Sequence, residues 1–528
     1  MRRRLLILIV LAVPVGLAAW LLPDVTRTSR LTEPRYVPSG DQELAWFHTT
    51  TAGNTWERFV TGLKQAERLV PGLHVDDSDA FQDQTTNTPE VVLSKDGHAG
   101  KVRVRWYKLS SDATAADWVK ALAQRTPAPL AVVGGGSSDR ALDLAKAMNA
   151  QTEWKGERPL LLITTATADE VEHGGDGARC ELIDVYYRAF RFCFTNKQMA
   201  EAVTDFVVHD PTLRPGPVMW PGLKTVFAAA AGPWHALTAA SELSADHTLK
   251  VFAIAWQDDP YSIDLSWQFR VSLREKYGSD APRGPLSLRA TPRVDQYEPP
   301  FSVGSQSKPN RAEAELVERV LADLPPRGER SLLILPTIAP PARRVLRTLA
   351  EGVPLIGRRM VAITGDGISV NTIYRDGEFA WPVRAVPVPM VMFTHADPFG
   401  WDDALPPPSS TDDVLHFAEL GRVVAESIFV PPEFAQQYPT EEGLIARAND
   451  LGVRFQARKP EFFDAKRNRL GGQGEFVVVL RPTIRDSRSV GKTAEDATIE
   501  TYRRGTGRAW VPVKALPITH GKGGRKSP

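Results

Sequence analysis

A glycine-rich turn followed by two serines is the part of this sequence whose residue types are best suited to binding chemistry. The apolar run at 130–133 reads as a buried strand, and it continues through three glycines into Ser137 and Ser138. Apolar positions at helical spacing follow, so the pattern predicts a strand, a tight turn and a serine-capped helix. The first turn of a helix leaves backbone N–H groups unpaired, and such groups attract anions. Gly136, Ser137 and Ser138 are therefore predicted to bind a carboxylate or a phosphate, with simple helix capping by Ser138 as the alternative.

Several motifs that imitate catalytic or metal sites fail on residue type. The run at 491–493 ends like a phosphate-binding loop, but Asp486 stands where the first glycine should be, and a carboxylate repels phosphate. Asp139 likewise replaces a glycine of the nucleophile-elbow and dinucleotide-binding patterns. The group Glu170, Glu172 and His173 is more typical of a solvated loop than of a metal site. The sequence predicts a protein that is not an enzyme and that uses no cofactor and no metal.

Length and charge limit the architecture and the partners. A chain of 528 residues exceeds what one hydrophobic core usually supports, so more than one lobe is expected. The composition is 42% hydrophobic and 24% charged, as in ordinary globular proteins, and the net charge is only +1. Because no strong positive field is present, nucleic acid is not an expected partner.

Alternating strand and helix patterns predict an α/β fold. Strands are expected at 43–48, 101–108, 130–133, 160–164 and 187–194, with helices at 55–69, 114–125 and after 137 and 194. The pattern restarts with strands at 249–255, 331–335 and 359–363 and helices at 262–277, 342–351 and 412–428. Residues 462–482 resemble a hairpin turned by Gly471 and Gly472, and 212–247 fit neither unit and read as an insertion. This order of elements makes parallel sheets covered on both faces.

The N-terminus predicts export from the cytoplasm. Three arginines at 2–4 precede an apolar run at 5–22, which as a helix would rise about 27 Å, close to the thickness of a bilayer core. The arginines place the start of the chain in the cytoplasm and the remainder outside. A cleaved signal peptide is the alternative, since Gly16 and Ala18 could form a cleavage site. Both cases predict a periplasmic or extracellular protein, either anchored to the inner membrane by this helix or secreted.

The two cysteines, Cys180 and Cys193, leave two alternatives open. In an exported protein a disulfide between them would join neighbouring strands across a short loop. The other reading is a pair of buried thiols, because Cys193 lies in an alternating apolar run.

The order of motifs resembles the type I periplasmic binding proteins, and more narrowly the substrate-binding, leucine-binding-protein-like component of branched-chain amino acid ABC transporters. The resemblance covers roughly residues 42–482 and consists of GGGSSDRALDLAKAM, the TTAT segment after the next strand, YRAFRFCFTNKQMAEAV, AWQDDPYSIDL, ITGDGISVN and FFDAKRNRLGGQGEFVVV. It implies two doubly wound parallel-sheet lobes joined by a hinge, which close on a ligand.

The resemblance also implies a division of the chain. The expected segments are a membrane anchor or signal at 1–23, a linker at 24–41, lobe I at 42–195, lobe II at 196–384, a return to lobe I at 385–460, a return to lobe II at 461–515 and a flexible basic tail at 516–528.

Four further ligand-binding residues follow from the resemblance. Thr165 and Thr167 fall at the strand end next to the serine turn, Tyr261 falls where the family places an aromatic that closes over the ligand, and Asp366 matches the acidic position facing the ligand ammonium. The alternatives are a partly exposed tyrosine at a helix start and an aspartate that stabilises its own loop. Ile338 stands where the family often has an aromatic residue, so a small carboxylate or amide other than an amino acid would also suit the site.

The function that the resemblance implies is capture of a small polar, amino acid-like ligand and its delivery to an ABC transporter permease. A membrane-tethered sensory or scaffolding ectodomain of the same fold, without a transport role, is the alternative.

Overall fold

The structure is a computed structural model. It describes residues 33–81, 87–173, 178–217, 250–256, 259–277, 293–297, 311–325, 328–353, 356–370, 388–401, 410–434, 436–438, 440, 443–458, 461–472, 474–482, 496–505 and 509–519. The expected anchor at 1–23, most of the insertion at 212–247 and most of the tail at 516–528 lie outside these residues. Within the described ranges, no helix combines the length and the apolar character needed to cross a membrane.

The first sheet forms lobe I. Its strand order is β2-β3-β4-β1-β5-β6-β9, with the pairs from β4 to β9 parallel and the β2-β3 and β3-β4 pairs antiparallel. The strands are β1 (Gln42–Thr49), β2 (Leu73–Asp76), β3 (Glu90–Lys95), β4 (Val102–Leu109), β5 (Ala131–Gly134), β6 (Leu160–Ile163) and β9 (Ala189–Arg191). The helices of this lobe are α2 (Gly53–Leu69), α3 (Ala115–Ala123), α4 (Ser138–Ala150), α12 (Thr411–Ile428) and α13 (Ala448–Ala457).

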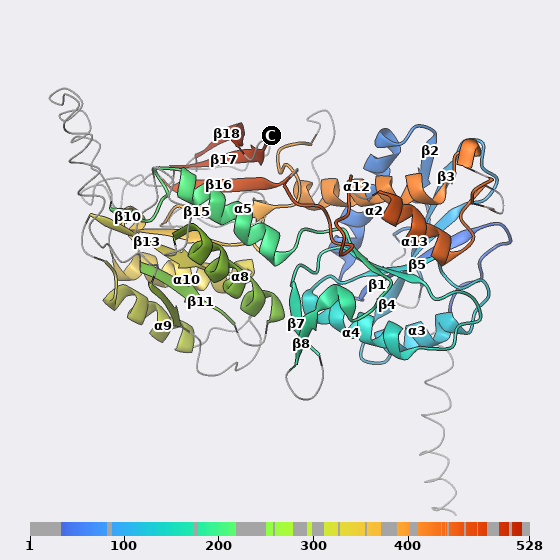
Figure 1. The fold of residues 1–528 in the computed structure, drawn as a ribbon, viewed down its shortest axis with the longest axis horizontal. Helices are drawn as coiled ribbons and strands as arrows, with labels where there is room; N and C mark the ends of the chain where they lie inside the picture. Colours follow the sequence, from blue (N-terminus) through green and yellow to red (C-terminus); the bar gives the residue numbers. More distant parts are fainter. Residues whose placement is uncertain are drawn as a thin grey trace, which may run out of the picture.

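The second sheet forms lobe II, which lies beside lobe I in Figure 1. Its order is β12-β11-β13-β14-β15-β16-β17-β18, parallel as far as β15 and antiparallel from there on, with β10 pairing β13. The strands are β10 (Gly216–Pro217), β11 (Lys250–Ile254), β12 (Arg293–Tyr297), β13 (Glu329–Ile334), β14 (Met360–Ile363), β15 (Met390–Thr394), β16 (Phe476–Pro482), β17 (Asp496–Arg504) and β18 (Trp510–Thr519). The helices are α5 (Asn196–His209), α8 (Pro260–Tyr277), α9 (Arg311–Ala322) and α10 (Ala339–Gly352).

Smaller elements complete the description. The pair β7 (Glu170–Glu172) and β8 (Arg179–Glu181) forms a separate two-stranded ribbon, and the short 3-10 turns are η1 (Leu182–Asp184), η2 (Ile356–Arg358) and η4 (Pro432–Phe434). Figure 1 shows the β7-β8 ribbon projecting from lobe I next to one end of α8 in lobe II.

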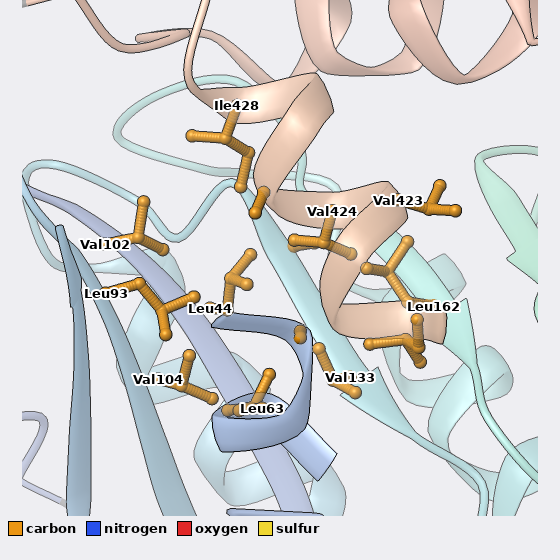
Figure 2. Packing of buried hydrophobic residues seen from close by; sticks show 14 of the residues in the cluster. Leu44, Leu63, Leu93, Val102, Val104, Val133, Leu162, Val423, Val424 and Ile428 are labelled. Atoms are coloured by element: carbon orange, nitrogen blue, oxygen red, sulfur yellow. The ribbon is translucent and has the colours of Figure 1, made fainter. Parts of the chain in front are cut away.

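Each sheet has a hydrophobic core on both faces, because alternate residues of its central strands point to opposite sides. In β1, Leu44 and Trp46 join one core cluster, whereas Ala45 and Phe47 join the cluster on the other face. Figure 2 shows the first of these clusters, in which Leu63 of α2 and Val424 of α12 approach the sheet residues. Full burial of one such side chain stabilises the fold by roughly 1.5–3 kcal/mol. Continuous apolar runs therefore become central strands.

The predicted central strands and helices form close to their expected positions, but three expectations need correction. Contrary to an all-parallel arrangement, each sheet has antiparallel strands at one edge, β2 and β3 in the first sheet and β16, β17 and β18 in the second. Contrary to the boundary expected at 385, β15 pairs with β14 and β16, so the chain leaves lobe II only after Thr394. The hairpin expected at 462–482 does not form: Phe463 and Arg469 make an isolated bridge, and β16 pairs with β15 and β17. The physical reason is that β16 supplies apolar residues to both cores of the second sheet.

The chain crosses between the lobes three times. The first crossing joins β9 to α5 through Phe192–Thr195, the second joins β15 to α12, and the third leads from α13 to β16. After the second crossing, α12 packs along α2 on lobe I. Two of the helices that cover lobe I, α12 and α13, therefore come from the last third of the chain.

Contrary to the disulfide alternative, both cysteines are free thiols. Cys193 is buried directly after β9, where its Sγ donates to the carbonyl oxygen of Ala166 at 3.4 Å. Burial raises the pKa of the Cys193 thiol to about 12. Cys180 lies on the β7-β8 ribbon opposite Val171. It is partly buried and packs against the hydrophobic cluster that contains Cys193.

A buried ionic network lies at the amino ends of the first-sheet strands. The side chains of Glu43 and Arg105 are almost fully buried, and Oε2 of Glu43 lies 2.6 Å from Nη1 of Arg105. Nε of the same guanidinium pairs with Oε2 of Glu90. Arg103, Asp41 and Arg125 extend the network, so its three carboxylates meet three guanidiniums. Arg105 also donates to the carbonyl oxygens of Arg35 and Tyr36, and this fixes the segment that enters the first strand.

Replacement of Gly62 by alanine tests the packing of α2 on α12. An added Cβ at this position would lie 2.5 Å from Cβ of Phe417, so the two helices would have to separate. We expect Gly62→Ala to lower the free energy of unfolding by about 1–3 kcal/mol, the usual cost of an overpacked core. Urea unfolding followed by circular dichroism measures this change.

Gly53→Ala is the matched control, because nothing lies within 4 Å of a Cβ added there. It should leave the stability unchanged or raise it by up to about 1 kcal/mol. Equal stability of the two variants would contradict the close packing of α2 on α12.

Candidate functional site

One cleft of about 790 Å³ lies between the two lobes. The carboxyl ends of strands of the first sheet and the amino ends of α2, α4, α8, α10 and α12 border this cleft. Loops and unpaired helix N–H groups are therefore concentrated there. Its walls come from both lobes and consist of His48, Thr55, Arg58, Gly136, Ser137, Ser138, Asp139, Arg140, Thr165, Thr167, Asp259, Pro260, Tyr261, Ile338, Asp366, Gly367, His395, Asp412, Asp413 and Phe417. All seven residues predicted from the sequence to bind a ligand are among them.

The serine turn forms as predicted, but the alternative of capping by Ser138 is wrong, because Ser137 occupies the N-cap position of α4. Gly135 has a φ of +87°, a left-handed conformation that lets the chain turn sharply after β5. Ser137 is the N-cap residue of α4, and its side chain makes no capping hydrogen bond. Ser138 is buried, and its Oγ accepts from the backbone N–H of Ala168 at 3.2 Å. Ser137 therefore offers the freer hydroxyl, whereas Ser138 ties α4 to the loop after β6.

The two threonines stabilise the floor of the cleft. The Thr165 hydroxyl donates to the carbonyl oxygen of Gly135 at 3.0 Å and so fixes the glycine turn. Thr167 is buried, and its carbonyl oxygen accepts from the backbone N–H of Asn196, the first residue of α5, at 2.7 Å. Both residues line the cleft and also hold neighbouring segments in place.

Tyr261 and Asp366 approach each other on the lobe II side. The Tyr261 hydroxyl accepts from the backbone N–H of Gly367 at 3.0 Å. Burial, and then the nearby charge of Asp366, raise the pKa of Tyr261 well above its usual range, so its hydroxyl stays protonated. Asp366 Oδ2 lies 2.8 Å from Nε2 of His395. The loop aspartate therefore has a side-chain partner of its own, from a residue that the sequence analysis did not select.

His395 belongs to a cluster of side chains that joins all three crossings. We call it the hinge cluster, and its members are Phe194, His395, His416 and Arg469. The backbone N–H of Phe194 donates to Nδ1 of His395 at 3.4 Å, which leaves Nε2 to donate to Asp366. The rings of Phe194 and His395 are parallel, with centroids 5.7 Å apart. The Arg469 guanidinium lies 4.1 Å from the centre of the Phe194 ring and donates to Nδ1 of His416 at 3.2 Å.

The hinge cluster keeps His416 neutral. Burial, and then the charges of His395 and Arg469, lower the pKa of His416 well below its usual range. Its Nε2 donates to the carbonyl oxygen of Thr164 at 2.8 Å. One side chain of α12 is thus tied both to the end of β6 and to the third crossing.

A further lobe-to-lobe contact lies beside the cleft. The backbone N–H of Asp169 in lobe I donates to Oδ2 of Asp264 in α8 at 2.8 Å, and the side-chain amide of Asn196 donates to the same oxygen. Burial, and then the charge of Asp169, raise the pKa of Asp264 to about 6. Because the folded state raises this pKa, the ionisation of Asp264 beside Asp169 lowers the stability of the folded state as the pH rises through about 6.

The carboxyl end of β1 contributes His48, which the sequence analysis treated only as a strand residue. Its ring is more than nine-tenths buried and stacks on Trp46 with centroids 5.0 Å apart. The backbone N–H of Thr49 donates to Nδ1 at 3.0 Å, so Nε2 carries the hydrogen of the neutral ring. Nε2 lies over Gly136, where an added Cβ would be only 2.3 Å away. A glycine at 136 is therefore required for this approach.

The wall formed by α2 and α12 was also missed by the sequence analysis. Asp412 and Asp413 occupy the first turn of α12, where negative charge is favourable, and Phe417 follows one turn later. Arg58 of α2 lies 2.9 Å from Asp413. The sequence signal was present, since two acidic residues open a predicted helix, but nothing in the sequence placed that helix beside the serine turn.

The cleft presents both neutral hydrogen-bond donors and carboxylates. The amino end of α4, the Ser137 hydroxyl and His48 supply neutral donors, whereas Asp366 and Asp412 supply carboxylates. Such an arrangement can orient a small molecule with an anionic and a cationic end. Among the described residues, no group of three or more histidine, cysteine, aspartate or glutamate side chains is placed to hold a metal ion.

Two α/β lobes, three crossings and a cleft between the lobes are the arrangement that the sequence resemblance implied. The fold is α/β, with two sheets whose central strands are parallel. No family model and no curated protein sequence matches the chain.

Solved structures of binding proteins are similar to this chain at low identity. A leucine-binding protein from Thermotoga maritima has 12% identity and a TM-score of 0.45, over 90% of this chain and 98% of that one. An ABC transporter substrate-binding protein from Desulfitobacterium hafniense has 11% identity and a TM-score of 0.44, over 89% and 99%. A solute-binding protein from Rhodopseudomonas palustris, in complex with 3,4-dihydroxybenzoic acid, has 11% identity and a TM-score of 0.43, over 91% and 99%. Similarity at this level assigns no ligand.

The neutrality of His48 predicts a specific loss of stability in acid. Burial, and then the charge of Arg140, lower the pKa of His48 from 6.5 to about 4. Between these values the unfolded chain binds a proton that the folded chain does not, so stability falls as the pH falls. The loss from this group amounts to about 3 kcal/mol. Urea unfolding at several pH values should show that His48→Gln loses less stability than the wild type between pH 7 and pH 4.

The comparison concerns the slope with pH and not the stability at one pH, because the substitution also changes packing against Trp46. His416 contributes a loss of the same sign in both proteins, since its pKa is lowered too. Identical slopes for the wild type and His48→Gln would show that His48 is not held neutral.

Proposed function

We propose that this protein is an extracytoplasmic solute-binding protein, which captures a small polar, amino acid-like ligand between its two lobes and delivers it to an ABC transporter permease. The observation that carries the proposal is the cleft itself, in which donors from lobe I and a carboxylate from lobe II face one space next to three chain crossings. A site divided between two lobes is completed only when the lobes approach, as in hinged closure around a ligand.

The anionic end of the ligand is assigned to the amino end of α4. Gly136, Ser137 and Ser138 present backbone N–H groups there, and the Ser137 hydroxyl is not used for capping. The helix dipole favours an anion at this place by about 0.3–1 kcal/mol at an exposed site, and more where water is excluded. Thr165 and Thr167 form the adjacent floor, where a hydroxyl or carbonyl oxygen can accept from the ligand.

The cationic end is assigned to Asp366, and closure is assigned to Tyr261. Asp366 lies on the loop after β14 and is only 18% exposed. Tyr261, at the start of α8, lies beside it and bonds to the same loop. Movement of lobe II toward lobe I would bring both side chains against a ligand held at α4.

Delivery and cellular location complete the proposal. The N-terminal pattern of three arginines and an apolar run supports export and attachment to the inner membrane. The permease is the proposed partner that receives the ligand when the lobes reopen.

A thermal-shift panel tests ligand capture. The panel contains the common amino acids, small carboxylates and hydroxybenzoates. A ligand at 100 times its Kd should stabilise the fold by about 2.7 kcal/mol and raise Tm measurably. Ser137→Ala and Asp366→Asn should each weaken the best ligand by about 10–100-fold, because each removes a hydrogen bond to a charged group.

Asp143→Asn is the matched control, since Asp143 is an exposed residue of α4 that does not line the cleft. It should bind as tightly as the wild type. The site assignment fails if Ser137→Ala and Asp366→Asn also bind as tightly, and the function fails if no compound of the panel raises Tm.

Hinged closure is a separate prediction. Small-angle X-ray scattering should show a smaller radius of gyration when the best ligand of the panel is added to the wild type. Asp366→Asn, at the same ligand concentration, should show a smaller decrease because the lobe II contact is weakened. A ligand that binds without any change in the scattering curve would argue against closure.

A further inference from the structure

The cleft contains more negative charge than a single ammonium group neutralises. Five aspartates line it against two arginines: Asp139, Asp259, Asp366, Asp412 and Asp413, with Arg58 and Arg140. Arg58 pairs with Asp413, and Asp139 and Arg140 are exposed neighbours on α4, where solvent screens both. Asp259 accepts from the backbone N–H of Tyr261 and so caps the start of α8. Asp366 and Asp412 remain as the carboxylates of the interior.

Asp412 is the more buried of these two carboxylates. It is only 6% exposed, and its Oδ1 accepts from the Ser410 hydroxyl at 2.8 Å. Burial, and then the charge of Asp413, raise the pKa of Asp412 to about 6, as expected for a carboxylate without a nearby fixed cation. Within the described part of the chain, no lysine or arginine nitrogen lies within ion-pair distance of Asp412 or Asp366.

The His48 side chain is a second, independent feature that points to a ligand in the cleft, because its Nε2 requires a hydrogen-bond acceptor. The His48 ring is more than nine-tenths buried and lines the cleft. Its Nδ1 is used by the backbone N–H of Thr49, and its protonated Nε2 has no hydrogen-bond acceptor among the described residues. Nε2 is not a fully buried atom and faces the space of the cleft, so a bound molecule can supply its acceptor there. The corner between His48 and Ser137 is therefore suited to an acceptor such as a carboxylate.

We infer that the ligand is a basic amino acid or a comparable carboxylate with two cationic groups, and that Asp412 is the specificity-determining residue for the second cation. The inference rests on the proposed function and names the ligand class of the same cleft. The carboxylate end lies toward His48 and Ser137, one cationic group is bound by Asp366, and the other lies against Asp412.

Charge balance explains the preference. A neutral amino acid brings one ammonium group, so one of the two interior carboxylates would remain unpaired while the closing lobes exclude water from it. A second cationic group removes this cost and converts Asp412 into half of an ion pair. His395 and His416 do not substitute for that cation, because His395 uses its Nε2 to donate to Asp366 and His416 is held neutral.

Matched pairs of ligands test the inference on the full chain. Isothermal titration calorimetry at pH 7.5 compares L-arginine with L-citrulline and L-lysine with L-norleucine, pairs of similar shape that differ in the side-chain cation. The wild type should bind the cationic member of at least one pair ten-fold or more tightly than its neutral partner. Asp412→Asn should weaken that cationic ligand at least ten-fold and leave the neutral partner within about three-fold.

Asp143→Asn is again the control and should retain the wild-type preference. The inference is overturned if the wild type prefers the neutral members, or if folded Asp412→Asn keeps the wild-type preference. The wild-type comparison decides the matter even if Asp412→Asn does not fold. A hydroxybenzoate or leucine that binds more tightly than every basic compound would overturn this inference and leave the proposed function standing, whereas absence of binding by all compounds would overturn both.

Discussion

The packing of His395 against Phe194 is the contact on which the geometry of the site depends. His395 is the first residue after β15, and Phe194 lies in the crossing that leads from β9 to α5. One imidazole therefore joins two crossings through Nδ1, while its Nε2 holds Asp366 at the cleft. Arg469 on the third crossing lies over the other partner of this stack. Because the crossings share one set of contacts, the cleft carboxylate and the hinge cannot move independently, and the position of lobe II fixes what the cleft presents to a ligand.

The protein treats buried charge differently at the two ends of its first sheet. At the amino ends of the strands, Glu43, Glu90 and Asp41 are matched by Arg103, Arg105 and Arg125, so desolvation is offset by close ion pairs and hydrogen bonds. At the carboxyl ends, His48 and His416 are held neutral, and no described lysine or arginine pairs with Asp366 or Asp412. The first arrangement is complete without a ligand and holds the lobe together. The carboxylates of the second arrangement are neutralised only when a cationic group binds beside them. This contrast distinguishes a structural network from a binding site.

The sequence predicted the site's framework well and its individual contacts poorly. Asp366 follows a strand of the second sheet, so its place in the same cleft was expected from the resemblance and not from local pattern. Gly136, Ser137, Thr165 and Thr167 follow parallel strands of the first sheet, whose carboxyl ends meet at one edge. Their convergence was therefore predictable from local pattern. The roles of the hydroxyls were not, because Thr165 donates to a carbonyl 30 residues earlier in the chain and Ser138 accepts from an amide 30 residues later. The expected hairpin at 462–482 failed for a related reason: local turn residues suggested a short pairing, but β16 pairs with β15 and β17, which lie outside that segment.

By itself the sequence determined two α/β lobes, the glycine–serine turn and the positions of most central strands, since continuous apolar runs and helical spacing are local properties of the chain. Only the tertiary structure decided that α12 returns to pack on α2, that Asp412 and His48 face the same cleft, and that β15 belongs to lobe II. The first two outcomes join residues hundreds of positions apart, and all three depend on which apolar surfaces bury one another. Several alternative pairings satisfy the same local pattern, so side-chain packing between lobes and helices had to choose among them.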